Sequence, residues 1–98
     1  MVVVAKIRVK AGREAEAEAA FRKQIDYVKR EEPATLLYLL HRGRKDPAVF
    51  LFYERYANPE AFDRHGKTAA IQELFRSLQP LLEGAPAIEL YDELGGKG

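Results

Sequence analysis

Two successive segments with strand character, Thr35–Arg42 and residues 48–56, carry apolar side chains on both of their faces. The segment between them, GRKDP, has the glycine, aspartate and proline of a turn, so the two strands should pair as an antiparallel hairpin. An antiparallel strand with one face in water alternates apolar and polar residues. These strands do not alternate in this way, which predicts a sheet that is covered on both faces.

The N-terminal third of the chain has the pattern of a strand followed by an amphipathic helix. Residues 2–10 alternate apolar with basic side chains over most of their length, as a strand does. Gly12 separates this strand from residues 13–30, where apolar residues recur at spacings of three and four, as on one face of a helix. Pro33 ends the helix, because the residue before a proline avoids helical geometry.

The C-terminal half predicts two helices and a last strand. A short helix is expected over residues 60–65, a longer one with an apolar stripe follows it, and residues 87–94 form the fourth strand. Capping and breaking residues mark the helix ends: Asn58 and Pro59 before the short helix, Gly66 after it, Thr68 before the longer helix and Pro80 in its last turn.

The resulting order, β-α-β-β-α-β, is that of the ferredoxin-like α+β fold with a four-stranded antiparallel sheet. One domain is expected over residues 1–94, followed by a flexible glycine-rich tail over residues 95–98. The helices of so short a chain can cover only one face of the sheet. The sequence therefore predicts a homodimer whose sheets lie face to face, and the alternative is a monomer with an apolar open face.

Composition excludes several classes of partner and site. The chain has 16 basic and 15 acidic residues, so its net charge of +1 gives no electrostatic basis for binding nucleic acid or an anionic membrane. It has no cysteine, which excludes disulfides, thiolate nucleophiles and cysteine metal ligands. No apolar run approaches the roughly 20 residues of a membrane helix, and the N-terminus lacks a signal-peptide arrangement, so a soluble, cytoplasmic protein is expected.

Four pieces spread over nearly the whole chain resemble one protein family. They are VVVAKIRVKAG, EEPATLLY, FLFYERYANPEAFDRH and FRSLQPLLEGAPAIELYDEL, of which the third is the most specific. The family often shows tyrosine, glutamate and an aromatic residue there, then a polar turn, an Ala-Phe-like pair and a histidine. The chain is therefore similar to the antibiotic biosynthesis monooxygenase (ABM) family, a set of small dimeric α+β barrels that includes quinol monooxygenase-like proteins.

The resemblance implies a pocket between the sheet and the two later helices. Characterised members oxidise polycyclic aromatic phenols or quinols with O2 without metal, flavin or haem, so no cofactor is expected, and the partners would be a small aromatic molecule and O2. Many members have a second histidine where this chain has Ala70, which argues against a two-histidine mechanism. Haem-degrading members carry a tryptophan and a haem-ligating histidine; this chain has no tryptophan and has Phe75 at the ligand position, so haem degradation is not expected.

Two ionisable side chains are the candidate catalytic residues. His65, one of two histidines, lies at the end of the short helix, where it could take a phenolic proton, bind an oxyanion, or only cap helix carbonyls. Glu54 lies in phase with apolar residues of the third strand, so its carboxylate needs a partner. It could orient His65 or bind a substrate hydroxyl. The alternative is a structural ion pair with Arg55, Arg64 or a basic group on the first strand.

Five aromatic side chains are candidates for a substrate-binding wall: Tyr38, Phe52, Phe62, Phe75 and Tyr91. If they line a pocket, the tyrosine hydroxyls could hydrogen-bond a ligand; the alternative is that all five are ordinary core residues. His41, at the end of the second strand, is expected to be solvated. The two histidines lack metal-ligand spacing and no carboxylate cluster completes a site, so no metal is expected.

The family resemblance, together with these residues, implies a cofactor-independent monooxygenase that oxidises a quinol or phenol with O2, with His65 as the proton-handling group. The alternative from another class is a non-catalytic dimer that binds a small molecule in the same pocket. An isomerase acting on a small phosphorylated or lactone substrate would need basic groups in the pocket, and none is obvious near His65.

Overall fold

The computed structural model describes residues 1–98 and contains four strands, three α-helices and one short 3₁₀ helix. In chain order they are β1 (Val2–Arg8), α1 (Glu14–Glu31), β2 (Thr35–Arg42), β3 (Val49–Tyr56), α2 (Pro59–Gly66), α3 (Ala69–Leu78), η1 (Gln79–Leu81) and β4 (Ala87–Tyr91). The strands form one antiparallel sheet in the order β2-β3-β1-β4. This is the ferredoxin-like α+β fold, so the predicted fold class is confirmed, with two helices in its second crossover.

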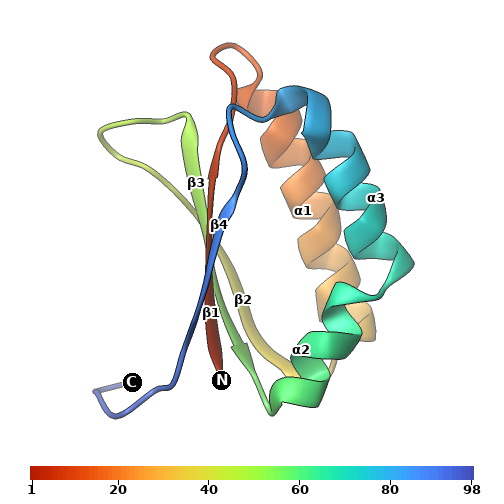
Figure 1. The fold of residues 1–98 in the computed structure, drawn as a ribbon, viewed down its shortest axis with the longest axis vertical. Helices are drawn as coiled ribbons and strands as arrows, with labels where there is room; N and C mark the ends of the chain where they lie inside the picture. Colours follow the sequence, from red (N-terminus) through yellow and green to blue (C-terminus); the bar gives the residue numbers. More distant parts are fainter.

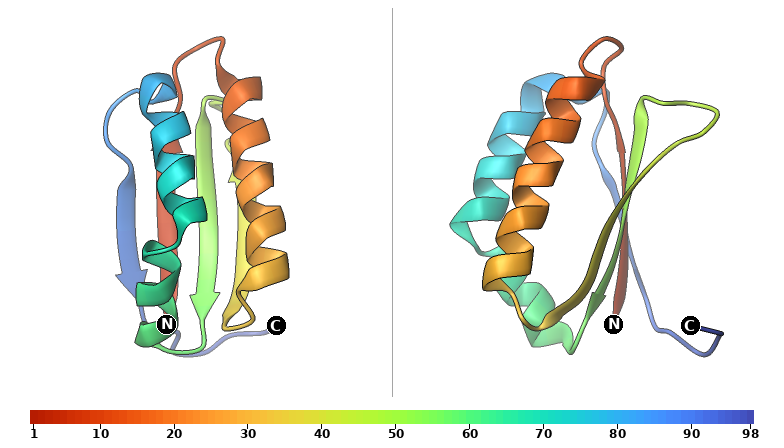
Figure 2. Two further views of the ribbon diagram at one scale, coloured as in Figure 1. Left: turned by 90° about the vertical axis from the view of Figure 1, so that its right-hand side faces the viewer. Right: turned by 180° about the vertical axis from the view of Figure 1, so that it is seen from behind.

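The molecule has two layers, a sheet and a helical layer on one side of it (Figure 1). Helices α1 and α3 lie side by side on this face, α1 toward the β2 edge and α3 toward the β4 edge (Figure 2). Helix α2 closes one end of the layer, beside β2 and β3. The opposite face of the sheet has no helix over it (Figure 1).

Alternate side chains of β1 and β3 point toward the helices and build the main core. The ring centroids of Phe50 and Phe52 lie 5.2 and 5.3 Å from that of Phe21 on α1. The predicted apolar stripe of α3 is buried in the same cluster: Ile71, Leu74 and Leu78. Full burial of one side chain of this size stabilises a fold by about 1.5–3 kcal/mol, so these contacts fix both long helices on the sheet.

The predicted starts of α2 and α3 are confirmed by their caps, whereas Gly66, predicted to follow α2, is its last residue. Oδ1 of Asn58 accepts a hydrogen bond from the backbone N–H of Ala61 at 2.9 Å, and Oγ1 of Thr68 accepts one from Ile71 at 3.1 Å. Pro80 lies just beyond α3, where η1 replaces a further α-helical turn. None of the three helices combines the length and apolar character needed to cross a membrane.

Three strands are shorter than predicted: β3 begins at Val49, one residue late, and β1 and β4 both end early. β4 ends at Tyr91, three residues early, because its partner strand β1 begins at Val2, directly opposite Tyr91. β1 stops before Val9, which forms only an isolated bridge to Leu82. Residues 92–98 have no regular secondary structure.

The uncovered face of the sheet is apolar at its centre. Leu39 of β2 lies opposite Tyr53 of β3, which in turn lies opposite Val4 of β1, so three apolar side chains form a row across the strands. Leu36 departs from the alternation predicted for β2, which would place it toward the helices. It lies instead in a β-bulge, and its side chain is exposed.

Candidate active site

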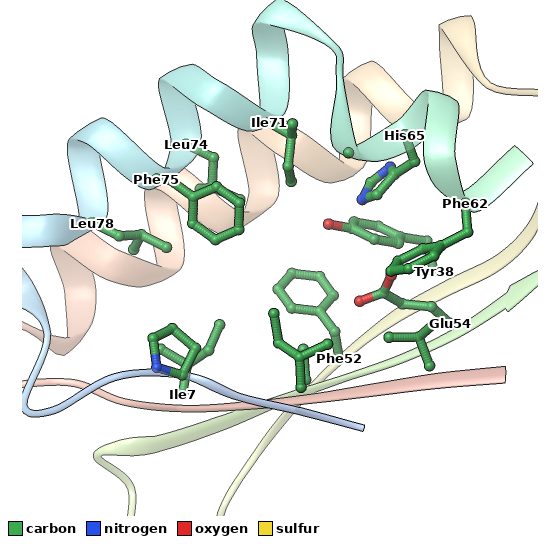
Figure 3. Close-up of a pocket in the computed structure, with 15 residues that line it drawn as sticks. Ile7, Tyr38, Phe52, Glu54, Phe62, His65, Ile71, Leu74, Phe75 and Leu78 are labelled. Carbon is green, nitrogen blue, oxygen red and sulfur yellow. The ribbon is translucent and has the colours of Figure 1, made fainter. Parts of the chain in front are cut away.

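A cavity of about 200 Å³ lies between the sheet and helices α2 and α3 (Figure 3). An apolar cavity of about 150 Å³ is large enough for benzene, so this pocket has room for a small aromatic ring. Eleven of its 15 lining residues are hydrophobic. Three side chains bring polar groups into this apolar wall: Tyr38, Glu54 and His65.

His65 lies near the C-terminal end of α2, where its side chain is buried beside two tyrosine rings. The ring centroids of Tyr38 and Tyr56 lie 5.3 and 5.5 Å from the centroid of the imidazole. Its Nδ1 atom lies 2.7 Å from Oε1 of Glu32, the residue that follows α1. The ring reaches into the pocket (Figure 3), and its Nε2 atom has no hydrogen-bond partner in the protein. Glu32, and not Glu54, is therefore the carboxylate bonded to His65.

Glu54 is a buried carboxyl group, 5% exposed, on β3 opposite Tyr38. Its Oε1 accepts a hydrogen bond from the hydroxyl of Tyr56 at 2.5 Å. Burial raises the pKa of Glu54, and the hydrogen bond from Tyr56 opposes this only in part. Arg55, one of the predicted ion-pair partners, instead bonds Glu93 at 2.6 Å on the other face of the sheet. Glu54 therefore holds its proton to a higher pH than an exposed glutamate does.

Tyr38 supplies the third polar group. Its ring centroid lies 4.7 Å from that of Phe52, and its hydroxyl end points into the pocket (Figure 3). Burial raises the pKa of the Tyr38 hydroxyl, and the charge of Glu54 raises it further. The hydroxyl therefore stays protonated at neutral pH and is available as a hydrogen-bond donor to a ligand oxygen.

Aromatic side chains form much of the pocket wall. Phe52, Phe62 and Phe75 all line it, together with Tyr38, at positions for which the sequence predicted such a role. Phe75 on α3 is 44% exposed, and Ile88 on β4 is 48% exposed. These two side chains therefore mark the mouth of the pocket, between α3 and the β4 edge of the sheet.

Tyr91 and His41 lie away from the pocket. Tyr91 pairs with Val2 of β1, whose side chain is on the face opposite the pocket-lining Val3, so the prediction that Tyr91 lines this pocket is wrong. His41 is exposed near the end of β2, as expected, with Nδ1 3.3 Å from the carbonyl oxygen of Leu51. No three histidine, aspartate or glutamate side chains lie close enough together to hold a metal ion.

Glu32 is the site residue that sequence reasoning missed. It lies 33 positions before His65, and nothing in its type distinguishes it from the neighbouring Glu31. The only feature of the sequence that points to Glu32 is its place in the order of strands and helices. In a β2–β3 hairpin the start of β2 and the end of β3 meet at one end of the sheet, so the residues just before β2 lie near the helix that follows β3.

The chain matches the model of the antibiotic biosynthesis monooxygenase family over residues 1–77. It therefore belongs to this family, as the sequence pieces indicated. No curated protein matches the chain.

Solved structures from several organisms share the fold. A protein from Caulobacter crescentus, whose name assigns it to the antibiotic biosynthesis monooxygenases, is 33% identical, with 96% of this chain and 89% of that chain covered and a TM-score of 0.91. A protein from Shewanella oneidensis is 32% identical, with coverages of 92% and 86% and a TM-score of 0.84. One from Nitrosomonas europaea, also assigned in name to these monooxygenases, has 21% identity, coverages of 99% and 92% and a TM-score of 0.91, which shows the common fold.

Proposed function

We propose that this protein is a cofactor-independent monooxygenase that oxidises a small aromatic quinol or phenol with O2. The observation that carries the proposal is the Nε2 atom of His65, which has no protein partner and belongs to a ring that reaches into an apolar, aromatic-walled pocket. Membership of the monooxygenase family and the named structural relatives support the same reaction class.

The pocket suits a substrate that is apolar except for one edge. An aromatic ring enters past Phe75 and packs against Phe52 and Phe62, while its hydroxyl group meets His65. The Tyr38 hydroxyl donates a hydrogen bond to a second oxygen of the substrate. No lysine or arginine lines the pocket, so nothing there favours a phosphorylated substrate over a neutral one.

The chemistry follows from removal of one proton. His65 takes the proton of the substrate hydroxyl at Nε2, and the electron-rich anion that remains reduces O2. A carbon–oxygen bond forms at the activated ring carbon, and the resulting peroxide takes the proton back from Nε2 to become a hydroperoxide. Its O–O bond then breaks with loss of water, which leaves a carbonyl. Overall a phenol and O2 become a quinone and water, with both electrons for the water supplied by the substrate. The apolar wall limits the access of water to the anion.

Oxygen uptake tests the proposal directly. A panel of reduced quinones and aromatic phenols is incubated with the protein under a metal chelator, and O2 consumption is compared with the autoxidation rate of each compound. We expect at least one compound to be consumed faster, and His65→Ala to lower that rate by about 10²- to 10⁴-fold. His41→Ala, the other histidine, is the matched control and should leave the rate unchanged.

Two outcomes would contradict this function. A panel without any consumption above autoxidation removes the monooxygenase. Tight binding of an aromatic compound without turnover would instead support the alternative, a non-catalytic small-molecule binding protein. If turnover is found but His65→Ala keeps full activity, the proton-handling role of His65 fails while the reaction class stands.

A further inference from the structure

A second buried carboxylate lies directly behind His65. The side chain of Glu32 is 10% exposed, and its Oε1 atom accepts two hydrogen bonds, from the Thr35 hydroxyl at 2.8 Å and from Nδ1 of His65 at 2.7 Å. Its other oxygen, Oε2, is buried and has no partner in the protein. The backbone N–H of Glu32 bonds the carbonyl of Val28 at 3.0 Å, which ties the residue to the end of α1.

A surface hollow reaches this carboxylate from the outside. It has a volume of about 260 Å³, and Glu32, Arg64, His65 and Thr68 are among its ten lining residues. His65 also lines the aromatic pocket, so the histidine lies between the two cavities. One ring nitrogen is bonded on the Glu32 side, and the other is left for the pocket.

We propose that Glu32 is the positioning residue for His65: it holds the neutral imidazole as the Nδ1–H tautomer, which leaves the lone pair of Nε2 directed at the pocket. This inference rests on the proposed function, in which Nε2 accepts the substrate proton. In that step the substrate O–H bond breaks and the Nε2–H bond forms. The carboxylate of Glu32 then faces an imidazolium and balances its charge, while remaining ionised itself.

No other ionisable group around His65 is bonded to its Nδ1 atom. Glu54 is engaged by the hydroxyl of Tyr56 on the same strand, and Tyr38 presents a neutral phenol from β2. Arg64 is exposed on the same helix and lines the outer hollow. Glu32 is therefore the carboxylate in direct contact with the histidine.

Nitrogen NMR of the imidazoles tests the positioning without any substrate. The chain has only two histidines, so ¹⁵N-labelled imidazole signals are readily assigned with His41→Ala. At a pH where both rings are neutral, we expect His65 to carry its proton on Nδ1 in the wild type. In Glu32→Ala it should shift toward the Nε2–H tautomer, which is favoured in free histidine, while His41 stays unchanged. A wild-type His65 with its proton on Nε2 would overturn the inference.

Turnover of the most active compound from the oxygen-uptake panel provides the second test. Glu32→Gln keeps the size of the side chain and an oxygen acceptor but removes the charge. We expect kcat to fall by about 10²- to 10⁴-fold with KM little changed. Glu31→Gln, at the exposed neighbouring position, is the matched control. Wild-type kcat in a folded Glu32→Gln variant would overturn the inference.

Chemical rescue separates positioning from folding. In Glu32→Ala the hollow gives a small anion a route to the space behind His65. Added formate should raise the turnover rate of Glu32→Ala by about tenfold or more. Chloride at the same ionic strength should leave that rate unchanged. Equal rates with the two salts contradict the inference. If no compound is turned over at all, the proposed function fails, and the tautomer measurement still decides the role of Glu32.

Discussion

The carboxyl group of Glu54 couples the stability of the fold to pH. Burial raises the pKa of Glu54 in the folded state, so the folded protein keeps this proton at pH values at which the unfolded chain has lost it. The contribution of the Glu54 carboxyl group to the free energy of unfolding is most favourable below the pKa of the unfolded chain, about 4.3 for a glutamate. It decreases as the pH rises through the folded value, because ionisation then places a charge in the apolar wall.

Glu54→Gln should remove this pH dependence, since glutamine is neutral and still offers an oxygen to the Tyr56 hydroxyl. We expect the variant to be at least as stable as the wild type near pH 7.5, with an advantage that vanishes near pH 4. Each unit by which the pKa is raised corresponds to about 1.4 kcal/mol. Urea unfolding at several pH values measures the difference, with the exposed Glu83→Gln as control. A Glu54→Gln variant that is less stable by the same amount at every pH would show that the explanation is wrong.

Single residues differ in how far the sequence predicts them. The burial of Glu54 follows from its phase with Phe52 in a strand of period two, and the position of His65 follows from the cap and the break of a short helix. The bond from His65 to Glu32 joins residues 33 positions apart, and no local pattern encodes it. The hydrogen bond from Tyr56 to Glu54 was predictable, because residues two apart in a strand share a face.

Helix α3 combines a structural face and a pocket rim in neighbouring residues. Leu74 is buried in the core, whereas Phe75 is close to half exposed at the mouth of the pocket. Leu74→Ala should lower the free energy of unfolding by about 2–5 kcal/mol. Phe75→Ala should cost much less stability, yet it should raise KM for an aromatic substrate with kcat little changed, because it removes binding surface that does not react.

Thermal unfolding and steady-state kinetics of the two variants measure both effects. The pair is matched for the stability comparison, since each variant removes one apolar side chain from the same helix, whereas KM is compared with that of the wild type because Leu74 also lines the pocket. A Phe75→Ala variant that loses as much stability as Leu74→Ala would place Phe75 in the core instead of at the rim. An unchanged KM would mean that substrate enters by another route.

Element boundaries were predictable where they depend on local chemistry. The caps of α2 and α3 are set by single side chains, Asn58 and Thr68, and both were found from the sequence. The end of β4 depends on where its neighbour β1 begins, and a strand pattern drawn as far as Leu94 carries no information about that neighbour. The bulge at Leu36 likewise arises from pairing with β3 and has no signal in β2 alone.

At the scale of the whole molecule, one face of the sheet has no helix over it (Figure 1). Its centre is apolar, and its margins carry charges of both signs, with Lys6 and Arg8 on β1 and Glu89 on the adjacent β4. A face that carries cations and carboxylates can be complementary to a copy of itself about a two-fold axis. We therefore propose that two copies of this chain associate through this face.

Leu39 tests this assembly, because its side chain is 46% exposed near the middle of the face and a change there should cost the isolated subunit little. Size-exclusion chromatography with light scattering should give the wild type twice the 11.1 kDa mass of one chain. Leu39→Lys should give a single-chain mass at micromolar concentration, since each of two facing sheets would bury an unpaired cation. Ser77→Lys adds the same charge at an exposed position of α3 in the helical layer and should stay dimeric. A wild type of single-chain mass would leave the apolar face open to solvent and rule out the dimer.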